Sequence, residues 1–584
     1  MLEEQGNSSG VRKLEGHEIN LEDLQRILQG DISYRSIVDA FEIPHIEYFN
    51  MASATVDAHA SGNNSNRTAL ICVSKDETSQ SYTYSDLSKL SDRFASFLRN
   101  HGVKKGDVIA LFAEQGLECA MAHLGAYKVG GIVAPLSHLY GPEAVKHVLK
   151  DCGSKVIVTQ RNLWDRIQGS VADLAINLTI VSGEVKSGEI DFRDTISSNS
   201  DSKFNVDNTK IDDPALLLYT SGSTGMPKGI LHKQGLLRGY LSSVSLFYEL
   251  DLGKDNQVLW TASDWSWVAG IFNVMLTGWY FGQTVVAGSN QFSSTWAFDF
   301  LQKHQVTHCF LTPTALKRLA TYKDPKTHWP ELCLKAIGTG GEPLPASVLS
   351  WAQESLSIPI NEFYGLTEVN HLIGNCARLW PIKPGSMGRA YPGHKIAIIN
   401  EEGSEVPRGT VGEIAAYDDD PTLFIGYWKN VEKTEEMRIG HWIKTGDFGH
   451  QDEDGYFWYK GREDDLIKSS GYRIGPAEIE DALVGHPTVA EAAVIGVADE
   501  ERGQLIKAFV SVIDGIEPSQ QLIAELQEHV KSKLAFFKYP RLVEFVDQFP
   551  LTSTGKINRK ELRRREVARS ANKSDMSNST ITTP

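Results

Sequence analysis

The 584-residue chain lacks a surplus of basic residues, because 58 Lys and Arg stand against 74 Asp and Glu and give a net charge of -16. A globally basic nucleic-acid binder is therefore not expected. Cysteine is scarce as well: the six cysteines are widely spaced and no two form a Cys-x-x-Cys pair, so neither a zinc site nor a redox motif is indicated. Hydrophobic residues make up 41% and charged residues 23%, which is ordinary for globular domains and excludes wholesale disorder and collagen.

The chain also lacks a continuous apolar run of membrane-spanning length, which takes ~20 residues. The stretch Trp265–Phe298 contains no Asp, Glu, Lys or Arg, but four glycines interrupt it: Gly270, Gly278, Gly282 and Gly288. We expect a buried helix followed by a short strand here, and no membrane span. The first ten residues, MLEEQGNSSG, are polar and acidic with no signal-peptide pattern, so we expect a cytoplasmic protein.

Strand-like and helix-like segments alternate after about residue 67. Apolar β-branched runs predict strands at 68–73, 107–113 and 155–159, and longer amphipathic runs predict helices at 84–102, where Ser85 is the expected N-cap, and 117–130. This alternation predicts an α/β fold, with a large multi-layer domain whose mostly parallel sheets are covered by helices.

A change in composition near 461–475 predicts a second domain. After this polar, glycine-bearing stretch the sequence predicts a small α+β domain from helices at 476–486 and 518–534 and strands at 489–497, 506–513 and 542–546. We interpret the stretch as a hinge that lets the small domain move. The predicted organisation is an N-terminal extension, a large domain, the small domain and a polar tail, at 1–44, 45–463, 464–566 and 567–584 respectively.

The sequence TSGSTGMPKG at 220–229 is the strongest chemical signal. It follows ALLLY at 215–219, a predicted buried strand, so its successive N–H groups and hydroxyls can form an anion-binding nest, to which Lys228 adds a charge. It is not a Walker A loop, because Pro227 precedes the lysine and no Ser or Thr follows it. The predicted phosphate-binding residues are Thr220, Ser221, Gly222, Ser223, Thr224, Gly225 and Lys228.

This loop resembles the phosphate loop of the adenylate-forming (AMP-binding) enzymes, and five further segments match that superfamily in its order. They are GTGGEPLP (338–345), EFYGLTE (362–368), KTGD (444–447), GREDDLIKSSGYRIGPAEIE (461–480) and LTSTGKINRKEL (551–562). The resemblance covers roughly residues 45–566 and is strongest to short- and medium-chain acyl-CoA synthetases, the acetyl-CoA synthetase-like group.

The resemblance implies an ATP-dependent carboxylate–CoA ligase that first forms acyl-AMP and pyrophosphate, then acyl-CoA and AMP. ATP, Mg²⁺ and coenzyme A are the implied ligands, beside a small carboxylic acid. Lys556 would stabilise charge on the α-phosphate during the first step, Glu368 would hold Mg²⁺ beside the phosphates, and Thr367 lies next to it. The oligomeric state stays open.

The resemblance also implies the other substrate contacts. The remaining ATP-site residues would be Gly341, Glu342, Pro343, Glu362, Phe363, Tyr364, Gly365 and Leu366, with Asp447 and Arg462 at the ribose. Asp464 matches the hinge position. The residues expected to contact CoA are Ser470, Gly471, Tyr472, Arg473, Arg502 and Lys538.

The acid pocket is expected near Trp267, Val268, Gly270 and Gly365. Acetate-specific relatives carry Trp where this chain has Gly365, so we expect a deeper pocket that takes propionate or a longer, branched or ring acid. On this interpretation a tryptophan at 365 would fill the pocket and shift preference toward acetate.

Three alternatives remain. One is an adenylating enzyme for amino acids or aryl acids that does not use CoA. An amino-acid enzyme needs an anionic residue for the substrate ammonium; our alignment puts Val268 there, although Asp264 lies close by. Another is a luciferase-like oxygenase, which only the shared motifs support. The last is a non-catalytic nucleotide-binding protein; the intact set Lys228, Glu368, Asp447 and Lys556 argues against this one.

Overall fold

The chain separates into two compact units in the computed structural model. The structure describes residues 38, 46–197, 203–220, 227–254, 256–288, 290–463, 465–469, 472–499, 502–513, 515–535, 538–551 and 557–578. Unit 1 comprises Met1–Ile396 and Ala416–Thr445, and unit 2 comprises Ala397–Ala415 and Gly446–Pro584. Unit 2 thus takes in segments that precede residue 464, and the expected boundary at 463/464 stays a prediction.

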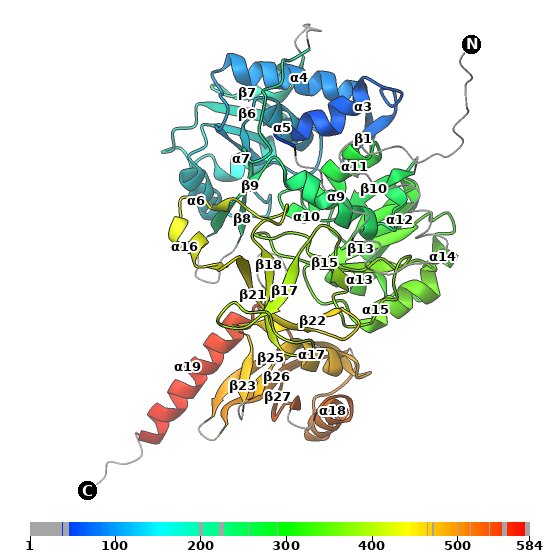
Figure 1. Cartoon of the computed structure of the whole chain (residues 1–584), viewed down its shortest axis with the longest axis vertical. Helices are drawn as coiled ribbons and strands as arrows, with labels where there is room; N and C mark the ends of the chain where they lie inside the picture. The colour runs from blue at the N-terminus through cyan, green and yellow to red at the C-terminus, as the bar shows by residue number, and fades with distance from the viewer. Residues whose placement is uncertain are drawn as a thin grey trace. The chain divides into compact units, whose positions relative to one another are not determined.

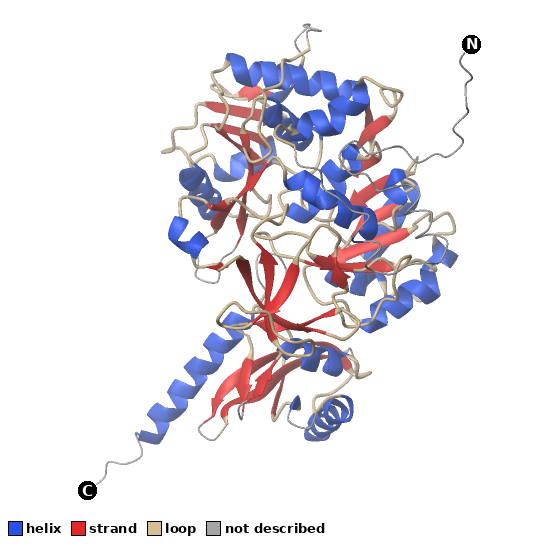
Figure 2. Ribbon diagram, in the orientation of Figure 1, coloured by secondary structure: helices blue, strands red, loops and turns tan. Residues whose placement is uncertain are grey.

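One large sheet of unit 1 has the strand order β19-β9-β8-β4-β3-β5-β6-β7. Figure 1 labels its strands β6, β7, β8 and β9. Its strands from β8 to β7 run parallel, with β9 and β19 added antiparallel. The strands are β3 (Val108–Phe112), β4 (Ile132–Pro135), β5 (Val156–Gln160), β6 (Leu178–Ser182), β7 (Ile190–Asp191), β8 (Pro214–Thr220), β9 (Lys228–Lys233) and β19 (Gly426–Tyr427). The accompanying helices are α4 (Tyr84–Asn100), α5 (Leu117–Lys128), α6 (Pro142–Cys152), α7 (Arg161–Ile167) and α8 (Phe192–Ile196). The central strands are almost wholly apolar, as expected where helices cover a parallel sheet (Figure 2).

The other large sheet of unit 1 has the order β16-β15-β14-β13-β12-β10-β11-β1-β2. It is parallel from β14 to β1 and antiparallel at both ends. Its strands are β1 (Thr68–Val73), β2 (Ser79–Thr83), β10 (Val258–Thr261), β11 (Thr284–Ala287), β12 (His308–Phe310), β13 (Ala336–Gly340), β14 (Ile360–Tyr364), β15 (Ile373–Gly374) and β16 (Arg389–Ala390). The other helical segments of unit 1, with η marking π- and 3-10-helical turns, are η1 (Ser53–Asp57), α3 (Ala58–Ala60), α9 (Leu236–Phe247), η2 (Asp251–Gly253), α10 (Val268–Gly270), η3 (Ile271–Met275), α11 (Leu276–Tyr280), α12 (Ser294–Lys303), α13 (Pro313–Leu319), α14 (Pro325–His328), α15 (Ala346–Trp351), η4 (Ala352–Leu356) and α16 (Val431–Glu435).

Unit 2 contains the predicted small α+β fold. Its strands and helices are β22 (Phe457–Arg462), β23 (Ile467–Ser469), β24 (Tyr472–Ile474), α17 (Pro476–Val484), β25 (Val489–Asp499), β26 (Gly503–Val512), α18 (Gln520–Lys533), β27 (Leu542–Phe545) and α19 (Arg559–Asn578). β26 lies between β25 and β27, and side chains of these strands, α17 and α18 form its core. A further sheet has the order β17-β18-β21-β20, with β22 on β21. Three of its strands contain a boundary between the units: β17 (Ile396–Ile399), β18 (Gly412–Tyr417) and β21 (Trp442–Gln451). The strand β20 (Arg438–Ile439) lies in unit 1.

The predicted α/β class, with a smaller C-terminal α+β unit, is confirmed. The predicted N-cap of α4 is wrong. Thr83, not Ser85, is the N-cap, because its hydroxyl accepts a hydrogen bond from the Asp86 N–H while the Asp86 carboxylate accepts one from the Thr83 N–H. The charge-free stretch Trp265–Phe298 is a buried helical segment followed by β11, as predicted. In the part of the chain that is described, we find no helix with the length and apolarity needed to cross a membrane.

Candidate active site

The predicted phosphate loop closes the hairpin between β8 and β9. These strands pair from Pro214↔Lys233 to Thr220↔Lys228, so the two ends of the loop are fixed opposite each other. Thr220 and Lys228 are half-buried at the loop end of the hairpin, and Thr220 comes directly after a buried part of β8. The loop residues between them, Ser221, Gly222, Ser223, Thr224 and Gly225, lie outside the described residues.

A short segment that follows Phe424 joins this hairpin to Glu368. Gly426 and Tyr427 pair with β9, and the Phe424 N–H donates to the Glu368 carbonyl at 3.0 Å. The Tyr427 hydroxyl donates to the Glu368 carboxylate at 2.7 Å. The predicted magnesium carboxylate is therefore tied by both its backbone and its side chain to the strand that starts at Lys228. No sequence pattern indicated a role for Tyr427, because it lies outside every segment that matches the motifs of the superfamily.

The turn at 341–345, which contains the predicted ATP-site residues Gly341, Glu342 and Pro343, leaves the carboxyl end of β13, beside the end of β14. Gly340 pairs with Phe363 in this parallel pair, so residues 341–345 and the loop after Tyr364 emerge at the same edge of the sheet. Ligands of open α/β sheets bind at this edge. Gly341 has φ +89°, which favours glycine.

Two predicted ATP-site glutamates support this turn. The Thr314 hydroxyl donates to Glu342 at 2.9 Å, and the Leu344 N–H donates to Glu362 at 3.2 Å. The structure thus places Gly341, Glu342, Pro343 and Glu362 together, with both carboxylates holding the turn in shape.

Gly365 lies in a tight loop that closes on itself. A Cβ atom at this position would lie 1.5 Å from the carbonyl oxygen of Asn370, and the Leu372 N–H donates back to the Tyr364 carbonyl at 3.1 Å. The expectation that a tryptophan at 365 would simply fill an acid pocket is therefore wrong, because even a methyl group collides with backbone. The glycine is explained by its own loop, and it no longer supports a deep acid pocket.

The other predicted acid-pocket segment starts α10. Trp267 and Val268 are half-buried, whereas Gly270 is buried and its Cβ would lie 2.6 Å from the Asp264 carbonyl. The Asp264 carboxylate accepts from the Ser137 hydroxyl at 2.9 Å and lies 3.0 Å from the His138 ring. The neighbouring Asp264 carboxylate raises the pKa of His138. Asp264 thus already has partners, which weakens the case for an amino-acid substrate whose ammonium it would bind.

Two buried histidines flank the Tyr364–Glu368 segment, and no sequence pattern indicated either of them as a site residue. His232 on β9 is fully buried beside the backbone of Thr367, and burial lowers its pKa to about 3. His371 follows Glu368 by three residues; burial places its pKa well below the ordinary value. Both imidazoles are therefore neutral at physiological pH.

The predicted ribose residues lie on neighbouring strands of unit 2. Asp447 on β21 is the register partner of Arg462 on β22, and their side chains are 3.3 Å apart. The Asp447 side chain is almost fully buried, whereas that of Arg462 is 57% exposed. The structure thus brings these two residues together, with the charge of Arg462 facing solvent.

The predicted CoA and hinge residues are only partly described. Asp464, Ser470, Gly471 and Lys556 lie outside the described residues, and for Tyr472 and Arg473 only the backbone of β24 is described. Lys538 forms an ion pair with Glu478 at 2.8 Å, which Lys460 also contacts at 3.2 Å. The Arg502 N–H donates to Asp499 at 2.8 Å. Lys538 is therefore already engaged within unit 2, where it shares the single negative charge of Glu478 with Lys460.

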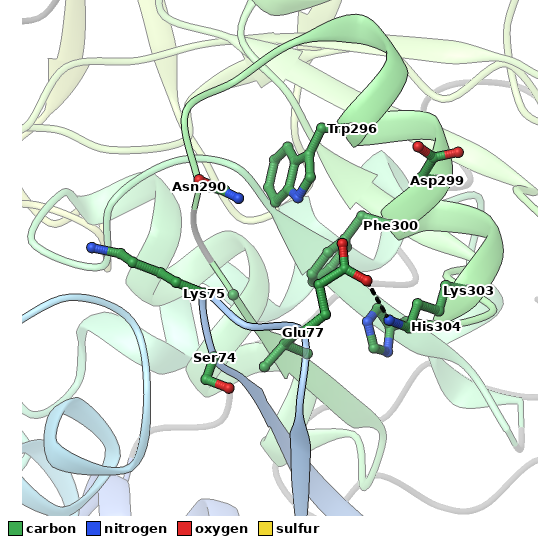
Figure 3. A pocket seen from close by; sticks show the side chains of 11 residues that line it. Ser74, Lys75, Glu77, Asn290, Trp296, Asp299, Phe300, Lys303 and His304 are labelled. Carbon is green, nitrogen blue, oxygen red and sulfur yellow. Dashed lines mark hydrogen bonds and ion pairs between the residues drawn. The ribbon is translucent and has the colours of Figure 1, made fainter.

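A small hollow lies at the carboxyl ends of β1 and β11, apart from these residues (Figure 3). Its volume of about 50 Å³ is far below the ~300 Å³ that small-molecule sites need. Its charges are also paired, Lys303 with Glu77 and Lys75 with Glu114, both at 2.8 Å. It does not hold a nucleotide or an acid.

The geometry is matched by known proteins. The family model "AMP-binding enzyme" matches residues 56–428, and "AMP-binding enzyme C-terminal domain" matches residues 478–556. The chain belongs to the AMP-binding enzyme family. The predicted enzyme class, the acyl-CoA synthetases, is confirmed by relatives that cover almost its whole length.

Among these relatives, acetyl-coenzyme A synthetase of Bacillus subtilis is 35% identical over 89% of this chain and 91% of its own length. Acyl-coenzyme A synthetase ACSM3, mitochondrial, of Rattus norvegicus is 33% identical over 94% of this chain and 98% of its own. The crystal structure of the anthranilate CoA ligase AuaEII in complex with anthranoyl-AMP superimposes with a TM-score of 0.80 at 27% identity, over 90% of this chain and 99% of that one.

Proposed function

We propose that this chain is an ATP-dependent carboxylate–CoA ligase that forms acyl-AMP and pyrophosphate, then acyl-CoA and AMP, from a short- or medium-chain acid. The observation that carries the proposal is the hydrogen bond from Tyr427 to Glu368, because it ties the carboxylate to the strand that follows the phosphate loop. The names of the relatives support the reaction class but leave the acid open. Propionate and longer, branched or ring acids stay a prediction that Gly365 no longer supports, because the glycine is explained by its own loop.

The residues present fit a magnesium ion. In the described residues no group of three or more His, Cys, Asp or Glu side chains could hold a metal by itself. Magnesium, however, commonly uses one or two carboxylates together with substrate phosphates. Glu368 would hold the ion, which would neutralise charge on the phosphates; Lys228 would add a second positive group at the end of the hairpin, and the turn at Gly341 would shape the adenine site.

Two half-reactions follow from the resemblance. In the first, Lys556 would stabilise the charge that develops on the α-phosphate when the carboxylate attacks it. In the second, rotation about Asp464 would bring Arg473 and its neighbours to CoA. These assignments, the mobility of the small domain and the cytoplasmic location stay predictions.

The test is a pyrophosphate-release assay with and without Mg²⁺, CoA and each member of an acid panel. We expect release that requires both Mg²⁺ and an acid, and acyl-CoA only when CoA is present. Pyrophosphate and acyl-AMP without any acyl-CoA would support the CoA-independent adenylating enzyme instead. No acid-dependent release with any acid would favour the non-catalytic alternative and overturn the proposal.

A further inference from the structure

A cluster of aromatic rings connects the two segments predicted to bind the acid. Phe272 follows Gly270 by two residues and stacks on Tyr240 of α9, with ring centroids 4.8 Å apart. Tyr240 in turn lies 4.7 Å from the ring of His371, in the loop that begins at Gly365. The cluster therefore lies between the start of the α10 helical segment and the loop after β14.

His371 is held at the centre of this cluster. Its ring lies 3.6 Å from that of Phe363 and 5.7 Å from that of Phe247. The preceding residue, Asn370, has φ +55°, which is uncommon for a residue with a side chain. Tyr240 donates to its side-chain oxygen at 2.8 Å, and its amide donates to the Thr422 carbonyl at 2.8 Å. These bonds hold the turn that sets the position of the His371 ring.

The polar atoms of this cluster differ in whether they have a hydrogen-bond partner. The Tyr240 and Tyr391 hydroxyls both have hydrogen-bond partners, Asn370 and the Asn375 carbonyl. The two ring nitrogens of His371 have none, although the side chain is only 1% exposed. A neutral imidazole has one N–H donor and one acceptor, and leaving both unused in an apolar site is costly. A phenylalanine would pack equally well here without that cost, so the imidazole points to a role beyond packing.

A second buried polar side chain follows Phe272 of the cluster in the sequence. Asn273 follows Phe272 in η3, is fully buried, and has no partner for either atom of its amide. η3 is a π-helical turn, a feature frequent at functional sites. Hydrogen-bonding capacity thus remains unused in η3 as well as in the loop after β14.

We propose that His371 is a specificity-determining residue of the acid site, and that the acid carries a hydrogen-bonding substituent, such as a hydroxyl group, which its imidazole binds. This inference rests on the proposed function and narrows its substrate class. A site built to hydrogen-bond a substrate group discriminates strongly against an analogue without that group, because the buried polar atoms are then left unpaired.

The test uses pairs of acids that differ only by a methyl or a hydroxyl group at one position: pentanoate with 4-hydroxybutanoate, and 4-methylbenzoate with 4-hydroxybenzoate. For the wild-type chain we expect kcat/KM to be at least about 10-fold higher for the hydroxyl member of one pair. His371→Phe keeps a ring of similar size and should shift that ratio about 10- to 100-fold toward the methyl member. His371→Gln, which keeps a donor and an acceptor, should retain part of the preference.

His123→Phe is the matched control, because His123 is also fully buried with a pKa of about 3, but lies on α5. It should leave the ratio unchanged. A wild-type preference for the methyl member in every pair, or equal losses for both members in His371→Phe, would overturn the inference. Either result could occur in an active ligase, whereas absence of pyrophosphate release with every acid would refute the proposed function itself.

Discussion

The ATP side and the acid side of the candidate site are built differently. On the ATP side the carboxylates of Glu342, Glu362 and Glu368 each accept a hydrogen bond from elsewhere in unit 1. On the acid side, aromatic rings surround His371, whose ring nitrogens lack hydrogen-bond partners, and the amide of Asn273 in η3 lacks them too. Under the proposed function, this difference means that the ATP side is preorganised for a constant ligand, whereas the acid side keeps its hydrogen-bonding capacity for the variable one.

The largest expected effect concerns the ATP side. Lys556→Ala should lower acyl-CoA formation from acid and ATP by about 10²–10³-fold, because one charge that stabilises the α-phosphate is lost. The same variant, given pre-made acyl-AMP, should still form acyl-CoA, and its ratio between paired acids should not change. A wild-type rate from acid and ATP would refute the catalytic assignment.

The next prediction concerns the loop that joins the two sides. Gly365→Ala should lower the free energy of unfolding by about 3 kcal/mol or more, because the new methyl group meets the Asn370 carbonyl at 1.5 Å. Urea unfolding measures this. Gly169→Ala is the control, since nothing lies within 4 Å of a Cβ there. If both variants were equally stable, the tight loop would not be the reason for the glycine.

A smaller effect separates the two sides directly. Tyr427→Phe removes the hydroxyl that donates to Glu368, and we expect KM for MgATP to rise about 10- to 100-fold, as for the loss of one hydrogen bond to a charged group. The preference between paired acids should stay unchanged. His371→Phe should show the reverse pattern. A variant that altered both quantities would mean that the two sides are coupled rather than independent.

The distance along the chain between contacting residues explains which features could be predicted from the sequence. Strands such as Thr68–Val73 and the ATP-site segments were predictable, because their chemistry depends on residue types at fixed local spacing. Tyr427 reaches Glu368 across 59 positions, and Tyr240 reaches Asn370 across 130. Such contacts have no local pattern.

Local spacing alone also misled at Gly365. Its meaning depended on how closely Asn370 returns to it, which the sequence does not express. The type of a residue in a matched segment therefore indicates which chemistry to expect. It does not indicate how much space surrounds the side chain.

The smallest expected effect tests whether Asp264 belongs to the acid side at all. The Asp264 carboxylate lies 3.0 Å from the His138 ring and raises the pKa of that histidine above its ordinary value of about 6.5. A raised pKa in the folded state means that the stabilisation is fully present below pH 6.5 and is lost as the pH rises through the folded-state pKa. Unfolding by urea should therefore show a modest loss of stability between pH 6 and pH 8 that His138→Gln removes. Because Asp264 is already engaged, Asp264→Asn should reduce the same pH dependence while the preference between paired acids stays as in the wild type. A change in acid preference in Asp264→Asn would instead place this carboxylate in the acid site and revive the amino-acid alternative.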